Sequence, residues 1–184
     1  MTNGGNDDII ETESTKEHGR NENMVDENNP VSAQSVLNKQ RTENIIKRGI
    51  SEERAIFDDG ILGQRAKYFE PESGFYDVTM HGTPETTLFF GERIDSHTLA
   101  QIIKQRGDYH GEPIRLLSCK TGVENQNKGD CFAQRLANEL NIDVKAPDNT
   151  LWAHAVINGT SKITIGSTKY DNSGKLVTFH PKYK

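Results

Sequence analysis

The middle of the chain alternates short apolar runs with segments whose apolar residues recur at helical spacing. The runs typical of buried strands lie at 75–81, 86–90, 114–118 and 144–146. The helical patterns are Leu99, Ile102 and Ile103 in one segment, and Phe132, Ala133, Leu136, Ala137 and Leu140 in another. Strand, helix, strand, helix and strand joined by short links predict an α/β fold with a mostly parallel central sheet flanked by helices.

Turn and capping residues mark where these elements begin and end. Asp95 or Ser96 can cap the first helix, which Gly107 would end, and Asp130 can cap the second helix. Three further strands are expected at 151–157, 162–169 and 175–179. The Asp171–Gly174 segment between the last two is rich in turn residues and predicts a C-terminal β-hairpin.

The residues before this core have weaker patterns. Val31–Lys47 has a weak helical pattern that Gly49 could close, and Glu52–Tyr68 has another that is interrupted by Gly60 and Gly63. We therefore expect a helical flanking segment at 31–70 and the main domain at 71–184.

Charge is distributed unevenly along the 184 residues. Residues 1–30 contain eight acidic and two basic side chains, a net charge of −6, which leaves 19 acidic and 20 basic residues in the rest of the chain. Few large apolar residues occur in this stretch, so we predict an acidic, disordered leader or linker at 1–30. The nearly neutral remainder argues against nucleic-acid binding. No apolar stretch approaches the ~20 residues that span a bilayer, and no Sec-type signal precedes the core.

Two segments contain the candidate catalytic residues, Val78–Gly82 and Ile114–Cys119. Each is typical of a buried strand with a reactive residue, His81 or Cys119, at its carboxyl end. Active sites of open α/β sheets lie at this end of the strands. The 38 residues between His81 and Cys119 suit parallel strands joined by a crossover helix. A thiol needs a neighbouring base to become a good nucleophile, and Gly82 would let a backbone N–H approach a substrate oxygen.

Other interpretations of these residues are open at this stage. A cysteine at a strand end can be only a small buried residue, and a lone histidine can be only a hydrogen-bonded one. A Cys119–Cys131 disulfide would consume the nucleophile. Zinc binding by these cysteines with His81 and His110 lacks the close paired spacing of zinc sites, so we expect no metal. Trp152, near a strand start, is a candidate substrate-binding residue.

The two segments together resemble the caspase-like cysteine peptidases, in which a histidine-glycine pair and a cysteine lie at the ends of adjacent strands. The similarity is greatest to the self-cleaving cysteine protease domains of large bacterial toxins and to related modules at the ends of polymorphic toxins. Three further stretches are similar: 83–93 with the helix from Asp95, 116–122 with 132–137, and 166–179 with its Asn172–Lys175 turn. The resemblance covers about 75–184 and implies a caspase-like fold whose C-terminal β-hairpin is a flap.

The resemblance implies a cysteine endopeptidase with Cys119 as nucleophile, His81 as base and a thioester intermediate. The backbone N–H groups of Gly82 and Cys119 would bind the oxyanion. The implied setting is a secreted, self-processing toxin or effector module that acts in a target-cell cytoplasm on a polypeptide, with an immunity or host protein as partner. Two alternatives stay open: a deamidase or acyltransferase with the same residues, and a non-catalytic binding or effector module on this fold.

The toxin proteases are activated by inositol hexakisphosphate, bound in a basic pocket beside the flap. The lysines of the corresponding half are spread along the strands without a dense cluster: Lys145, Lys162, Lys169, Lys175, Lys182 and Lys184. We therefore expect no cofactor, with inositol phosphate activation as the less favoured alternative.

Overall fold

The computed structural model describes residues 30–124 and 129–182, so most of the predicted acidic leader lies outside the described residues. The helices are α1 (Pro30–Ser51), α2 (Ile61–Ala66), α3 (Ser96–Gln105) and α4 (Phe132–Leu140). The strands are β1 (Tyr76–Thr79), β2 (His81–Gly82), β3 (Thr87–Phe89), β4 (Glu92–Ile94), β5 (Ile114–Leu117), β6 (Val144–Pro147), β7 (Leu151–Ile157), β8 (Thr160–Ile165) and β9 (Leu176–Phe179). The chain divides into two units, 1–37 and 38–184, and the boundary falls within α1. The second unit contains the sheets described below.

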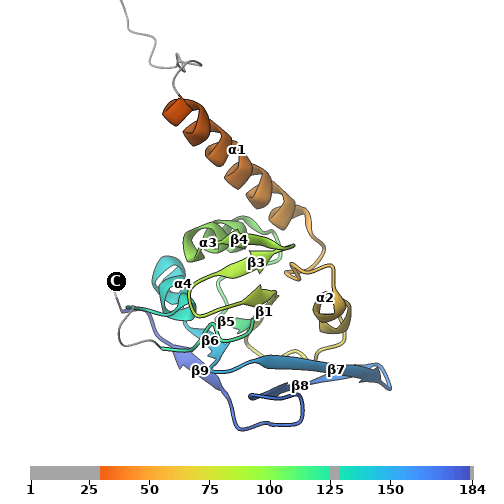
Figure 1. Ribbon diagram of the computed structural model, residues 1–184. Coiled ribbons are helices and arrows are strands. Elements are labelled where there is room, and N and C mark those ends of the chain that lie inside the picture. Colours follow the sequence, from red (N-terminus) through yellow and green to blue (C-terminus); the bar gives the residue numbers. More distant parts are fainter. Residues whose placement is uncertain (1–29, 125–128, 183–184) are drawn as a thin grey trace, which may run out of the picture. The chain divides into compact units, whose positions relative to one another are not determined.

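The main sheet has the order β1-β5-β6-β9 (Figure 1). β1 and β6 both pair with β5 in parallel, and β9 pairs with β6 in the antiparallel direction. Leu116 of β5 belongs to the core cluster that includes α3 and α4, whereas the adjacent Leu117 packs with Leu62 of α2 and Leu151 of β7. Because neighbouring residues of a strand face opposite sides, both faces of the sheet are covered. The predicted mostly parallel sheet flanked by helices is confirmed.

The predicted pairing of the last two strands is wrong. β8 pairs with β7 through a turn at Asn158 and Gly159, both in the left-handed region (φ 52° and 78°). An Asn-Gly pair favours this kind of hairpin turn, so the sequence contained a signal that our prediction did not use. β9 instead joins β6, where it buries Phe179 in the main core. Burial of Phe179 in the main core therefore stabilises the pairing of β9 with β6.

The predicted strand at 75–81 is divided at Met80. β1 belongs to the main sheet, whereas β2 pairs with β3 in a separate sheet of order β2-β3-β4. The side chain of Met80 between them is fully buried. The break therefore redirects His81 and Gly82 out of the plane of the main sheet at its edge.

The region before β1 contains less helix than expected at Glu52–Tyr68. Residues 55–57 are extended, and Ile56 forms a parallel bridge with Thr79. Only α2 is helical, because Gly60 and Gly63 interrupt the pattern and both donate their N–H groups to Asp58 Oδ2 (3.1 and 2.8 Å).

Three helix boundaries can be compared with the expectations. α1 continues to Ser51 beyond Gly49, where a Cβ would lie 2.6 Å from Ile102 Cγ2, so glycine permits this close packing. Asp95 caps α3 as predicted, since its Oδ1 accepts a hydrogen bond from Thr98 N–H at 2.8 Å. The cap predicted at Asp130 is wrong, because the N-cap position of α4 is Cys131.

Arg106 connects three elements of the second unit. Its buried guanidinium donates hydrogen bonds to Gly49 O (2.7 Å), to Tyr76 Oη (2.7 Å) and to both oxygens of Asp108 (2.8 Å each). Hydrogen bonding to Arg106 lowers the pKa of Asp108, and burial is the main cause of a raised pKa at Tyr76. The end of α1, the start of β1 and the end of α3 are thereby tied together.

We expect Arg106→Met to reduce the free energy of unfolding by about 3 kcal/mol, because it removes a buried cation and leaves its acceptors without this donor. Urea unfolding followed by circular dichroism measures the change. Lys47→Met, at an exposed position on α1, is the matched control and should change stability by no more than about 0.5 kcal/mol. Equal losses in the two variants would contradict a structural role for the Arg106 network.

Candidate active site

The segments Val78–Gly82 and Ile114–Cys119 lie side by side in the structure. The parallel register of β1 and β5 pairs Thr79 with Leu117, and Met80 N–H donates to Leu117 O at 3.5 Å. A Cβ placed on Gly82 would lie 2.2 Å from Ser118 Oγ. The α-carbon of Gly82 therefore packs directly on the residue that precedes Cys119, and only glycine fits this position without displacing its neighbours.

The chain makes a sharp turn immediately after Cys119. Lys120 has a φ of 59°, in the left-handed region that non-glycine residues seldom adopt. Its N–H donates to Asn149 O, and Gly122 N–H donates to Pro147 O, both at 2.9 Å. These hydrogen bonds fix the turn on the connection between β6 and β7. Cys119 is thus presented from a constrained turn.

The thiol of Cys119 is half-buried beside the β7 strand. Its Sγ donates to Leu151 O at 3.5 Å and packs against the cluster that contains Leu62, Leu117 and Leu151. Burial raises the pKa of Cys119, and the nearby charge of Lys120 opposes this effect only in part. The neutral thiol is therefore the favoured form of Cys119 in this arrangement.

His81 is paired with a carboxylate that we did not predict. Its Nε2 lies 3.5 Å from Asp58 Oδ1; the His81 side chain is half-exposed, whereas that of Asp58 is only 13% exposed. The other oxygen of Asp58 is held by the N–H groups of Gly60 and Gly63, which fixes the carboxylate at the start of α2. The signal available in the sequence was an aspartate followed by two glycines before a short helix.

Gly82 has a main-chain N–H that faces away from its partner strand. Thr83 N–H bonds to Thr86 O (2.8 Å), and in an antiparallel ladder the adjacent pair, Gly82 with Thr87, is then a non-hydrogen-bonded one. The N–H of Cys119 also has no main-chain acceptor among the described residues. Two backbone N–H groups, those of Gly82 and Cys119, are therefore without a main-chain acceptor among the described residues.

Two buried hydroxyl groups lie around Gly82. Thr87 Oγ1 and Ser118 Oγ are the buried side-chain oxygens without a hydrogen-bond partner in the described part of the chain. Thr87 stands opposite Gly82 in the ladder, and Ser118 Oγ occupies the space that a Gly82 side chain would need. Unfavourable polar burial is therefore concentrated next to the candidate site.

The other sequence candidates are not drawn into this site. Trp152 is half-buried and donates its indole N–H to Gly166 O at 3.1 Å, so its substrate-binding role stays a prediction. Cys131 is buried beneath α4, and both cysteines are free thiols. Within residues 30–124 and 129–182, no group of three or more His, Cys, Asp or Glu side chains could hold a metal ion. No helix in those ranges is long and apolar enough to cross a membrane.

Gly82→Ala should reduce the free energy of unfolding by about 2 kcal/mol, because its methyl group would collide with Ser118 Oγ and Thr121 Cγ2. Ser118→Ala removes a hydroxyl that has no hydrogen-bond partner among the described residues, but it also leaves a small cavity, so we expect it alone to change stability by less than about 0.5 kcal/mol. The double variant should recover at least about 1 kcal/mol of the Gly82→Ala loss, since one collision is removed. A double-mutant cycle from urea titrations measures this coupling, and simple additivity would contradict the contact.

Comparison with known proteins gives one match. The model of a family described as a domain of unknown function, DUF8616, matches residues 50–175. No curated protein and no solved structure matches the chain. The matched region contains Asp58, His81, Gly82 and Cys119, and it spans more than half of the sequence. The chain therefore belongs to the DUF8616 family.

Proposed function

We propose that this protein is a cysteine endopeptidase with a caspase-like arrangement of its catalytic groups. The proposal depends on the packing of Gly82 on Ser118. This contact brings the segments that end in His81-Gly82 and in Ser118-Cys119 to one edge of a parallel sheet. The resemblance to self-cleaving toxin proteases supports a polypeptide substrate and a self-processing effector module as its setting.

The chemistry begins at Cys119. His81 accepts the proton of the Cys119 thiol, and the thiolate sulfur attacks the scissile carbonyl carbon. The resulting oxyanion accepts hydrogen bonds from the N–H groups of Gly82 and Cys119. When the tetrahedral intermediate collapses, the carbon–nitrogen bond breaks and a thioester remains on Cys119. The amine leaves with a proton from His81, and a water activated by His81 then hydrolyses the thioester.

Asp58 positions His81 for these proton transfers. Its Oδ1 lies 3.5 Å from Nε2 of the imidazole and holds the orientation of the ring. The opposite ring nitrogen, Nδ1, is then the one available toward substrate and thiol. Asp58 acts through His81 and is a positioning residue.

The described arrangement corresponds to a resting state. The Cys119 thiol is bonded to Leu151 O, and Arg65 Nη1 donates to Ala153 O of the same strand at 2.7 Å. Both carbonyls belong to β7, beside the nucleophile. A substrate segment running along this strand would replace these side-chain donors, which frees the thiol for attack.

A second candidate function has its own support. The thiol and the imidazole each have another partner, Leu151 O and Asp58, and burial disfavours the thiolate. These features also suit a non-catalytic binding module that retains the fold. The following experiment distinguishes the two functions.

We expect the full chain, incubated with a mixed peptide library, to produce new amino termini that mass spectrometry can detect. Cys119→Ala should abolish cleavage, and His81→Gln should reduce its rate by about 10³-fold. Asp58→Asn retains an oxygen for the Gly60 and Gly63 N–H groups but removes the charge, and should reduce the rate by at least about tenfold.

His97 and Glu139 supply the matched controls, because their side chains form another exposed imidazole–carboxylate pair, 3.2 Å apart. His97→Gln and Glu139→Gln should leave cleavage unchanged. If the wild-type chain cleaves no peptide and its Cys119 alkylation does not depend on His81, the protein is the non-catalytic module.

The rate of Cys119 alkylation by iodoacetamide should rise with pH through a single inflection that lies above the ordinary thiol pKa. Burial raises the pKa of this group, so the reactive thiolate forms only under alkaline conditions when substrate is absent. Peptide mapping separates Cys119 from the buried Cys131. An inflection near neutral pH would instead indicate a thiolate–imidazolium pair before substrate binds.

A further inference from the structure

β1 is the outermost strand on one side of the main sheet, and its outer edge is only partly covered. Thr79 N–H donates to Ala55 O (2.9 Å), and Phe57 N–H donates to Thr79 O (2.8 Å). Residues 55–57 thus act as a very short neighbouring strand. Before residue 55 the chain bends through 52–54 toward α1, so this cover ends there.

The earlier part of the same edge, at Asp77, has no neighbouring strand among residues 30–124 and 129–182. Tyr76 N–H donates to Pro113 O and Met80 N–H to Leu117 O, so the main-chain groups of these alternate residues face β5. By the same alternation, the N–H and C=O of Asp77 face outward, as those of Thr79 do. An edge of this kind is a template for another extended chain.

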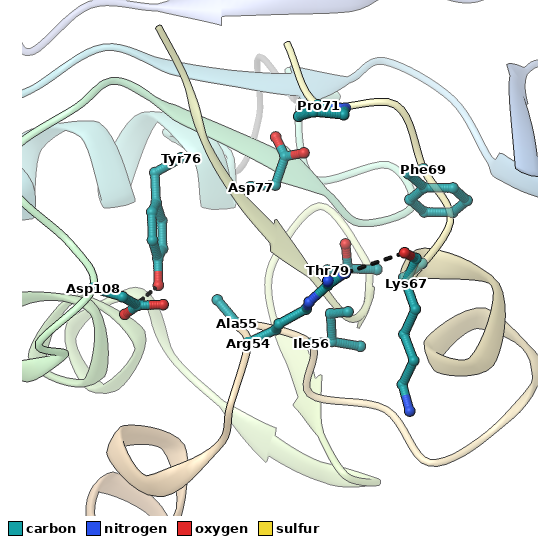
Figure 2. A pocket seen from close by; sticks show the side chains of 11 residues that line it. Arg54, Ala55, Ile56, Lys67, Phe69, Pro71, Tyr76, Asp77, Thr79 and Asp108 are labelled. Carbon is teal, nitrogen blue, oxygen red and sulfur yellow. Dashed lines mark hydrogen bonds between the residues drawn. The ribbon is translucent and has the colours of Figure 1, made fainter. Parts of the chain in front are cut away.

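A cavity of about 460 Å³ lies along this edge (Figure 2). Asp77 and Thr79 of β1 form one side, and Phe69 and Pro71 belong to the segment that follows α2. Ile56 adds another apolar wall. The volume lies within the ~300–1,000 Å³ of typical ligand pockets, and Asp77 belongs to its lining.

The charges that line this cavity are not balanced. The carboxylate of Asp77 is bound by Arg115, and that of Asp108 is bound by Arg106. The other charged residues of the lining are Arg54 and Lys67. Arg54 donates to the main-chain oxygen of Lys67 at 3.1 Å, and neither side chain has a carboxylate partner among the residues that the structure describes. The acidic groups are already neutralised, so the remaining charge is positive.

We infer that this cavity is a docking site for an extended acidic segment of a partner protein, which adds a strand to the outer edge of β1. Main-chain hydrogen bonds to Asp77 would supply the pairing, and carboxylates of the segment would lie beside Arg54 and Lys67. At ~3.3 Å per residue, about three residues of the partner pass along the uncovered part of β1. The inference does not depend on catalysis by Cys119.

Titration of the full ¹⁵N-labelled chain with acetyl-Val-Glu-Val-Glu-Val-amide tests the proposal by NMR. The amide signals of Asp77 and Thr79 should shift together as the peptide binds. A peptide of the same sequence with alternate N-methyl groups keeps the charge but loses main-chain donors, and should bind at least about tenfold more weakly. The Lys counterpart of the peptide should not bind. Cys119→Ala protein is titrated in parallel to exclude peptide cleavage.

The Arg54→Gln/Lys67→Gln variant should also weaken binding at least about tenfold, because it removes the two cations of the cavity lining. Lys39→Gln/Lys47→Gln removes two exposed cations from α1 and should bind as the wild type does. Three results would overturn the proposal: no binding at millimolar peptide, equal binding of the N-methylated peptide, or shifts that do not include Asp77. Equal binding of the N-methylated peptide would reveal attraction of an anion without strand pairing.

Discussion

The contact between the α-carbon of Gly82 and the turn that begins at Ser118 is the constraint on which the candidate site depends. It requires the parallel register of β1 with β5, the break at Met80 and a residue without a side chain at position 82. A similarly close main-chain contact occurs at Gly122, where a Cβ would lie 2.7 Å from Ala146 O. Glycines therefore stand where main chains from different strands meet at this edge.

Several unfavourable features are gathered within a few residues of that contact. Ser118 and Thr87 each bury a hydroxyl that has no hydrogen-bond partner among the described residues, and Lys120 adopts a left-handed backbone. The surrounding structure tolerates them because β5 is buried along its whole length and is packed on both faces. Strained backbone and unpaired buried groups of this kind persist only where the surrounding structure over-determines them.

The sequence was sufficient to predict a mostly parallel sheet flanked by helices and the parallel strands that precede His81 and Cys119, since both follow from local patterns and from the spacing between the two residues. It was not sufficient for Asp58 or for the partner of β9. Asp58 contacts His81 only after residues 55–57 bridge to Thr79, a pairing too short to leave a periodic pattern. The location of β9 depended on which strand edge could bury Phe179, and a turn signal cannot decide between two such edges.

The three candidate groups share one geometric origin. Residues 55–57, β1 and β5 are neighbouring parallel segments, and the chain leaves them at Asp58, at His81 and Gly82, and at Cys119 respectively. Parallel neighbours end at the same edge of a sheet, so the pairing that protects part of the β1 edge also delivers the carboxylate to the imidazole. A shift of one residue in the pairing of 55–57 with β1 would turn side chains to the opposite face and separate Asp58 from His81. Coverage of the β1 edge and assembly of the site are therefore consequences of the same few main-chain hydrogen bonds.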